Sequence, residues 1–429
     1  MSVSIPSGAL RPWLAALLAL LMLTSAMLVA PSVEAKGPPE AVRFATFNAS
    51  LNRNSAGQAL TDLSTPNSAQ AKAVAEIIQR TRPEVLLINE FDYVDGSVTG
   101  NALTTAFQDN YLSVSQNGAE LITYPYVFVA PSNTGIPSGF DLDNSGGAPG
   151  GPNDALGFGF FPGQFGMAVF SQHPIAYDDV RTFQNFLWKD MPGARLPVNP
   201  TTGEPWYSAA ELEVLPLSSK SHWDVPIDIG GTTVHFLVSH PTPPVFDTAE
   251  DRNGRRNADE IRLWADYITP NAGDYIYDDA GGTGGLQPGA KFVIAGDQNS
   301  DPLDGDSIPG SIQQLLDNPR VNTSVTPESL GAVEQAALQG GANATHRSDP
   351  RYDTADFADG APGNLRADYV LPSRNLRIVG SGVFWPLNTD PLFRLVGVFS
   401  RPTFLGDFPS SDHRAVWVDL MVPGSARGG

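Results

Sequence analysis

A short apolar run that ends in polar side chains is the feature of this sequence that most constrains its fold. In FVIAGDQNSDP, residues 292–302, an apolar run leads into a glycine and then into a polar cluster. The runs RFATF, VLLIN and HFLVS end in a similar way. The polar residues at these run ends are Asn48, Glu90, His240, Asp297 and Asn299. Short apolar runs bounded by turn-forming residues indicate buried strands. We therefore expect several strands whose ends bring these side chains to one crevice.

Helical periodicity is confined to a few segments, and strands dominate. Residues 68–83 place apolar side chains on one helical stripe that stops at Pro83, between strands expected at 41–50 and 84–91. A short amphipathic helix is expected at 259–268. The order strand, helix, strand indicates a local βαβ-like unit.

The chain of 429 residues shows no internal repeat and no linker between halves. Gly, Pro and Asn enrich the segments 131–165 and 301–365, and the second contains one helical piece, SIQQLLD. We therefore expect a single domain at 36–429 with loop insertions near 131–165 and 301–365.

The residue types at the strand ends suit a divalent cation and a phosphate. Glu90 offers the hard oxygen ligands that Mg²⁺ and Ca²⁺ prefer, and Asn48 can complete such a site or hydrogen-bond a phosphate. The chain has no cysteine and no His-x-His or HExxH pair, so a zinc site is disfavoured. Taken alone, Asp297 and Asn299 also fit an ordinary turn, although an extended segment would point both to the same side.

A series of short motifs follows one order along the chain. The motifs are ATFN (45–48), INEFD (88–92), GMAVFSQHPI (166–175), VSHPTPP (238–244), IAGDQNSD (294–301), RADYVLPS (366–373) and SSDHRAV (410–416). This series resembles the endonuclease/exonuclease/phosphatase superfamily over roughly residues 41–420. The resemblance implies an α/β fold, a four-layer αββα sandwich in which two packed mixed β-sheets are flanked by helices. It also implies metal-dependent hydrolysis of a phosphoester by in-line attack of an activated water.

The resemblance implies a metal site at the first strand ends. Glu90 would be the main metal ligand, with Asn48 and Asp412 beside it. The implied cofactor is Mg²⁺, with Mn²⁺ or Ca²⁺ as alternatives.

The resemblance further implies a catalytic set of His240, Asp297, Asn299, Asp368 and His413. Asp297 would orient or activate the water, and Asn299 would hold phosphate. Asp368 would orient a histidine. His413 would be the general base or would polarise the phosphate, and His240 would lie near the phosphate or the leaving group. Pancreatic-type members carry a further acid that partners the first histidine, and the sequence identifies no counterpart.

Positive side chains near the expected site are candidates for binding a substrate phosphate. They are Lys220, Arg252, Arg255 and Arg256. The three arginines form either a cationic clamp or a solvated loop before a helix. His222 begins a strand expected to lie beside the one ending in His240, which favours a structural role.

The formal charge of −20 disfavours a long, non-specific grip on nucleic acid, because counterion release requires clustered Lys and Arg. A compact site that uses a metal is still compatible with a nucleic-acid substrate. DLDNSGG imitates the start of an EF-hand loop, but Pro152 stands where the bidentate Glu is required. A looser surface calcium site is the alternative for that segment.

Residues 1–35 have the order of a secretory signal: a segment with Arg11 and no acid, the apolar run LAALLALLMLTSAMLVA, and small residues before a cleavage point after Ala35. An uncleaved membrane anchor is the alternative. We expect an exported protein, secreted or periplasmic, with no stable membrane span after cleavage, acting as a monomer.

The substrate is open at this level, because fold and site do not set it. One hypothesis is a secreted phosphodiesterase or a nuclease acting on extracellular DNA. A second is a phosphatase or phospholipase-C-like enzyme acting on small phosphoesters, which the charge and the large loops favour slightly. A non-catalytic binding module fits least, because the polar set is complete.

Overall fold

The apolar runs form two mixed β-sheets. The computed structural model describes residues 1–3, 41–398 and 408–424, so most of the expected signal at 1–35 lies outside the described residues. The strands are β1 (Ala41–Asn48), β2 (Val85–Asn89), β3 (Tyr126–Phe128), β4 (Met167–Ser171), β5 (Arg181–Thr182), β6 (His222–Ile229), β7 (Thr232–Ser239), β8 (Lys291–Asp297), β9 (Asp368–Pro372), β10 (Arg377–Val383) and β11 (Val416–Met421). A 6-stranded sheet has the order β10-β11-β1-β2-β4-β3, and a 5-stranded sheet has the order β5-β6-β7-β8-β9.

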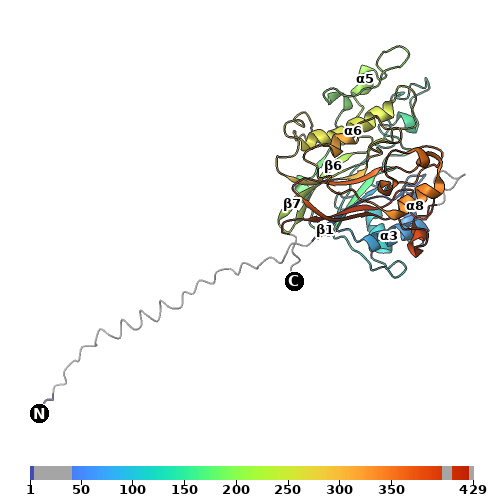
Figure 1. Ribbon diagram of the computed structural model, residues 1–429. Helices are drawn as coiled ribbons and strands as arrows, with labels where there is room; N and C mark the ends of the chain where they lie inside the picture. The colour runs from blue at the N-terminus through green and yellow to red at the C-terminus, as the bar shows by residue number, and fades with distance from the viewer. Residues whose placement is uncertain (4–40, 399–407, 425–429) are drawn as a thin grey trace. The chain divides into compact units, whose positions relative to one another are not determined.

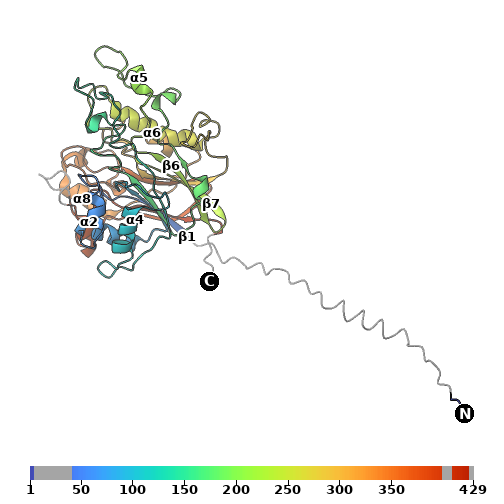
Figure 2. The same cartoon turned by 180° about the vertical axis from the view of Figure 1, so that it is seen from behind.

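Each sheet contains one parallel pair whose crossover includes a helix. β1 runs parallel to β2 with Asn48 opposite Asn89, and β7 runs parallel to β8. The helices are α2 (Gln58–Leu63), α3 (Ala69–Thr81), α4 (Ala102–Phe107), α5 (Ala209–Leu212), α6 (Arg252–Ile268), α7 (Gln313–Leu316) and α8 (Leu330–Gln339). Figure 1 shows α3 and α6 on opposite sides of the stacked sheets, and the reverse view in Figure 2 agrees, with α6 on one side and α2 and α4 on the other. The expected four-layer αββα sandwich is therefore confirmed.

Three apolar clusters hold the four layers together. The cluster between the sheets joins Phe44 of β1 to Phe236 of β7, with ring centroids 5.6 Å apart. The other two fill the space between each sheet and its helices, so that Leu86 packs in the cluster of α3 and Ile294 in that of α6. Because strand side chains alternate and both faces are covered, the central strands are apolar at nearly every position.

Helix α3 follows the predicted boundaries closely. The side chain of Ser68 caps its first turn by accepting a hydrogen bond from the Ala71 N–H, and Arg82 ends it in a left-handed conformation before Pro83. These local signals were visible in the sequence, which is why the prediction succeeded.

One helical prediction needs correction, and one helix was missed. The helix expected at 259–268 starts earlier, at Arg252. The periodicity did not reveal its first two turns, because they carry polar residues that are buried against neighbouring loops instead of an apolar stripe. Helix α8 was not expected. Its Leu330 and Leu338 are 71% and 65% exposed while Gly331 and Ala332 are buried, so its apolar pattern does not mark the buried face.

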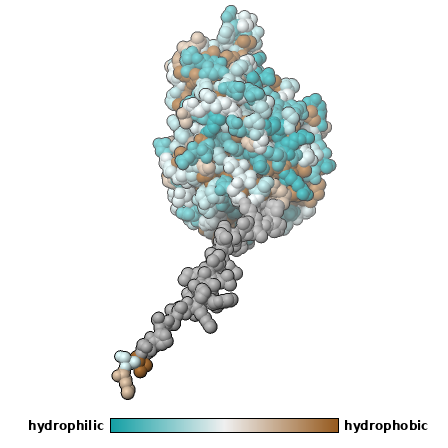
Figure 3. Space-filling model, turned by 90° about the vertical axis from the view of Figure 1, so that its left-hand side faces the viewer, coloured by the Kyte–Doolittle hydropathy of each residue, from teal (hydrophilic) through white to brown (hydrophobic). Residues whose placement is uncertain are grey.

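No helix in the described part of the chain is long and apolar enough to cross a membrane. On the face drawn in Figure 3, hydrophobic residues are scattered among hydrophilic ones. The segment 131–165, described throughout, forms a short 3-10 turn at Pro152–Asp154 and otherwise only isolated bridges.

Candidate active site

The polar strand ends of both sheets meet in one cluster. β8 ends at Asp297, which pairs in register with Asp368 at the start of β9. Asn48, the last residue of β1 in the other sheet, donates from Nδ2 to Asp297 Oδ2 at 3.1 Å and to Glu90 Oε1 at 3.1 Å. The side chain of Asn48 therefore links the expected metal-binding end of one sheet to the expected catalytic end of the other.

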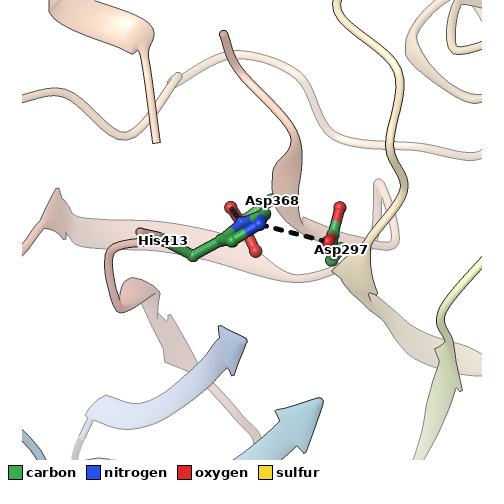
Figure 4. Close-up of side chains that lie close together, drawn as sticks. All are labelled: Asp297, Asp368 and His413. Carbon is green, nitrogen blue, oxygen red and sulfur yellow. Dashed lines mark hydrogen bonds and ion pairs between the residues drawn. The ribbon is translucent and has the colours of Figure 1, made fainter. Parts of the chain in front are cut away.

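Both expected histidines lie against the same carboxylate oxygen. The Nε2 atoms of His240 and His413 lie 3.4 Å and 3.6 Å from Asp297 Oδ2. The other ring nitrogen of His413, Nδ1, lies 2.8 Å from Asp368 Oδ2, which also accepts a hydrogen bond from Thr354 Oγ1 at 2.8 Å. Figure 4 shows the three side chains close together, with a dashed line from His413 to Asp297. This arrangement fixes the ring orientation of His413.

Charge is distributed unequally between the two histidines. Burial alone would lower the pKa of His413, but the Asp368 and Asp297 carboxylates raise it well above its ordinary value. Burial would raise the pKa of Asp297, but the neighbouring histidines lower it below its ordinary value. Burial, with the nearby charge of Lys220, lowers the pKa of His240 to about 4. At neutral pH the site thus holds a cationic His413, an anionic Asp297 and a neutral His240.

His240 contacts Asp297 through Nε2, but its other ring nitrogen, Nδ1, has no acid partner among the residues described. Its Nδ1 is buried and makes no hydrogen bond. The sequence identified no counterpart of the further acid found in pancreatic-type members, and the structure places none beside this nitrogen.

The carboxylates of Glu90 and Asp412 fit a divalent cation. Burial, followed by the charge of Asp412, raises the pKa of Glu90 to about 7. Neither carboxylate forms a salt bridge within the described ranges. Glu90 Oε1 accepts from Asn48, and Asp412 Oδ1 accepts from the hydroxyls of Ser50 and Ser411. Two hard anionic ligands held together without a paired cation are the donor set that Mg²⁺ or Ca²⁺ prefers.

A second grouping, Asp297, Asp368 and His413, also has ligand atoms within 4.8 Å of one another. Its atoms are already engaged with each other, because His413 Nδ1 is hydrogen-bonded to Asp368. Glu90, Asn48 and Asp412 are therefore the residues that could hold a cation, and the aspartate–histidine grouping is arranged to hold a proton on His413.

Asn299 does not continue the strand as the extended expectation required. Its φ of +50° is left-handed, its N–H donates to Asp297 Oδ1 at 2.8 Å, and its Nδ2 donates to Pro241 O at 3.1 Å. The segment after β8 is therefore both a turn and part of the site. Glu90 has a left-handed φ of +56° as well. Strained backbone of this kind clusters at functional sites.

The candidate phosphate-binding cations separate in the structure. Lys220 is buried, and burial lowers its pKa against the opposing charges of Glu260, Glu90 and Asp297, so its ammonium lies near the candidate site. Arg252 pairs with Glu250, and Arg255 Nε donates to the Glu250 carbonyl at 3.2 Å.

Arg256 is buried and bonds protein rather than solvent. Its guanidinium donates to the carbonyls of Leu217 at 2.8 Å, Leu156 at 2.7 Å and Pro216 at 2.8 Å. The three arginines belong to the first turns of α6, so neither a solvated loop nor a free clamp describes them. The structure therefore removes Arg256 from the expected three-arginine phosphate clamp, because its guanidinium donates to backbone carbonyls, while Arg252 and Arg255 each direct one donor to Glu250.

Some supporting residues were not anticipated. Thr354 orients Asp368, and it lies in the second insertion without any sequence signal. Asn89 Oδ1 accepts from the Asp297 N–H at 3.2 Å, and its place beside Glu90 could have marked it. Buried Glu260 of α6 accepts from the N–H groups of Ser219 and Thr242, each at 2.6 Å, and so ties together the two segments that carry Lys220 and His240.

A family model described as the Endonuclease/Exonuclease/phosphatase family matches residues 45–413. No curated protein gives a significant sequence match. Solved structures with a similar fold include an endonuclease/exonuclease/phosphatase from Beutenbergia cavernae DSM 12333 (TM-score 0.45, 15% identity, covering 89% of this chain and 72% of that one). Two others are a family protein from Leptotrichia buccalis C-1013-b (0.43, 13%, 89% and 100%) and sphingomyelinase C from Streptomyces griseocarneus (0.42, 12%, 88% and 99%).

Proposed function

The chain belongs to the endonuclease/exonuclease/phosphatase family, and on that premise we propose that it is an exported, divalent-metal-dependent phosphoesterase. One observation carries the proposal: His240 and His413 both approach Asp297 Oδ2, and Asn48 connects the same oxygen to Glu90. A site that only stabilised the fold would have no need to gather two histidines and several carboxylates in one buried cluster.

The chain's own residues have separate tasks in this proposal. Glu90, Asn48 and Asp412 would hold the cation, which when bound polarises a phosphoryl oxygen and stabilises the leaving oxygen. Asp297 remains an anion and orients the attacking water. The cationic His413 is held by Asp368 and donates a hydrogen bond to charge that develops on the phosphoryl group.

The remaining polar groups bind the phosphate. Neutral His240 can donate from Nε2, and Asn299 Nδ2 has a second N–H beyond the one bonded to Pro241 O. Lys220 adds one buried positive charge near the anionic residues. This is a compact phosphate site with one ammonium, which suits a small phosphoester better than a polyanion in a protein of charge −20.

A substrate panel tests the proposal. Purified protein lacking residues 1–35 is incubated with bis-p-nitrophenyl phosphate, p-nitrophenyl phosphate, sphingomyelin or plasmid DNA, each with Mg²⁺, Mn²⁺, Ca²⁺ or EDTA. We expect metal-dependent turnover of a small ester that EDTA abolishes, and we expect Glu90→Ala to remove it. Glu120→Ala is the matched control, because Glu120 is an exposed surface glutamate.

The pattern of turnover discriminates between the candidate functions. Nicking of plasmid with little small-ester turnover would favour the nuclease instead. The enzymatic proposal would be refuted if no substrate were turned over with any metal and if the Glu90→Ala variant behaved like the wild type in the same assays.

Export is tested separately. Expression of the full chain should yield a mature protein whose first residue is Lys36, as read by N-terminal sequencing of the secreted or periplasmic fraction. Retention of residues 1–35 in a membrane fraction would support the anchor alternative.

A further inference from the structure

The most exposed phenylalanines lie on two loops that adjoin the candidate site. Phe158 is 50% exposed, Phe160 66% and Phe246 74%, and the other strongly exposed large hydrophobic side chains in the described ranges are aliphatic or methionine. Phe158 and Phe160 belong to the 131–165 insertion, and Phe246 lies in the loop that follows His240. Single exposed apolar residues need no explanation, but exposed phenylalanines confined to two loops that begin or end beside candidate site residues do.

One end of the insertion loop is fixed beside Lys220. Gly157, next to Phe158, packs so closely on the backbone that a Cβ there would lie 1.8 Å from the carbonyl oxygen of Ser219. The carbonyl of Asn133 accepts a hydrogen bond from the Gly157 N–H, and the N–H of Asn133 donates to the carbonyl of Lys220 at 2.9 Å. Only glycine permits this approach.

The other end of the same loop is fixed beside Glu90. The N–H of Phe165 donates to Asp92 Oδ1 at 3.1 Å, and the N–H of Phe91 donates to the carbonyl of Gly166 at 3.0 Å. The loop that carries Phe158 and Phe160 therefore spans from the neighbour of Lys220 to the neighbours of Glu90. Lys220 and Glu90 each contribute charge to the candidate site.

The rings are held in a defined arrangement. Phe158 and Phe160 pack with centroids 5.6 Å apart at 79°, and Phe158 lies 6.4 Å from Phe165 at 31°. Phe165 and Phe246 have φ values of +55° and +66°. Bulky residues rarely adopt this conformation, and backbone strain of this kind points to function.

We propose that Phe158 and Phe160, with Phe246 on the loop that follows His240, bind an aromatic group carried by the substrate's phosphoester. This inference rests on the proposed function, because it assumes that a phosphate occupies the adjoining site. Two rings at a steep angle offer a face and an edge to a flat ligand, and a fixed platform loses little entropy when the ligand binds.

The alternatives fit the same surface less well. A charge of −20 repels an anionic polymer or an anionic bilayer. A single myristoyl chain gives only marginal membrane binding, and three partly exposed rings on two loops are a weaker anchor than that chain. A small phosphoester with an aromatic arm uses both the rings and the compact phosphate site.

Equilibrium binding tests the inference without any turnover. Ribose 5-phosphate carries a hydroxyl where adenosine 5′-monophosphate carries the base, and each is titrated calorimetrically into protein in EDTA buffer, in which the expected hydrolysis does not run. We expect the nucleotide to bind about tenfold more tightly to the wild type. In the Phe158→Ala/Phe160→Ala variant, the two ligands should bind within about twofold of each other, mainly because the nucleotide binds more weakly.

A matched variant and a melting curve guard against general damage. Leu338→Ala removes a side chain that is 65% exposed on α8 and should keep the full preference. The double variant should melt at the wild-type temperature, because both rings are largely in solvent. Equal affinity of the wild type for the two ligands, equal weakening of both ligands in the double variant, or no nucleotide binding would overturn the inference.

Two further arms separate this inference from the proposed function and from membrane binding. Thymidine 5′-(4-nitrophenyl phosphate) and methyl 4-nitrophenyl phosphate share one leaving group. If neither is hydrolysed while the nucleotide preference holds, the proposed function fails and the aromatic site stands. Co-sedimentation with phosphatidylcholine vesicles that depends on Phe158 and Phe160, without a nucleotide preference, would assign the rings to a bilayer and overturn the inference.

Discussion

Protonation of His222 should destabilise this protein in mild acid. His222 is 1% exposed, its Nε2 lies 3.0 Å from the carbonyl oxygen of Glu260, and its Nδ1 lies 2.7 Å from Ser218 Oγ. Because a carbonyl only accepts, Nε2 carries the proton, and Nδ1 accepts from the serine hydroxyl. This pairing suits the neutral ring. Burial lowers the pKa of His222 from 6.5 to about 4.

The size of the effect follows from that pKa. Between pH 6.5 and pH 4 the unfolded chain binds a proton on this histidine and the folded chain does not, so the free energy of unfolding rises with pH in this window. The stabilisation is complete above pH 6.5 and is lost as the pH falls toward 4. At about 1.36 kcal/mol per pKa unit, the loss between pH 7 and pH 4.5 is about 2.4 kcal/mol.

Urea unfolding in EDTA, followed by tryptophan fluorescence between pH 7 and pH 4.5, measures this loss. His222→Gln is the comparison, because glutamine keeps an N–H for the Glu260 carbonyl and does not titrate. The stability of the wild type relative to the variant should fall by about 2.4 kcal/mol across the window, and His240, which titrates in both proteins, should cancel. If the two stability curves run parallel with pH, His222 is not a buried neutral histidine and the reasoning fails.

Further outcomes follow from the same contacts. Asp368→Asn should lower kcat by a factor on the order of 10²–10⁴ with little change in KM, because His413 loses the carboxylate that fixes its charge and tautomer; an unchanged kcat in steady-state assays would exclude that role. Arg256→Ala should lower the free energy of unfolding by about 2–3 kcal/mol in urea unfolding, because buried carbonyls lose their hydrogen-bond donors. Arg255→Ala should leave the free energy of unfolding unchanged and alter kcat/KM by no more than about twofold. A large loss of kcat/KM in Arg255→Ala would instead support a role for Arg255 in binding phosphate. Phe236→Ala should cost about 3–5 kcal/mol in urea unfolding, since it empties the space between the sheets, and a loss below about 1 kcal/mol would contradict that packing.

The strands were predictable because the physics that forms them is local. A strand that is packed on both faces is apolar at nearly every position, as the burial of β2 and β8 shows. A polar residue marks the end of each strand, where the packing on both faces stops. The residue types at those ends, above all Glu90 and His240, therefore signalled a site before any fold was known. Helix α8 escaped prediction because its buried residues are small and its leucines face solvent.

The support of the site was less predictable than its members. Thr354 orients Asp368 from a loop insertion, and no periodicity marks it. The arginines of α6 looked like a phosphate clamp because charge alone is visible in a sequence. The carbonyls that occupy Arg256 come from residues 156, 216 and 217, and only the fold brings those to one guanidinium.

The backbone turns after the strands complete the argument. Glu90 and Asn299 directly follow or closely follow strands that end at the site, and both are left-handed. A strand end sets where a side chain lies, but the turn sets where it points. The turn folds Asn299 back onto Asp297 and Pro241, so that one segment satisfies its own backbone and still presents an amide to the site. For GDQN, a turn and a place in the candidate site are therefore compatible, because the turn directs Asn299 toward Asp297 and Pro241.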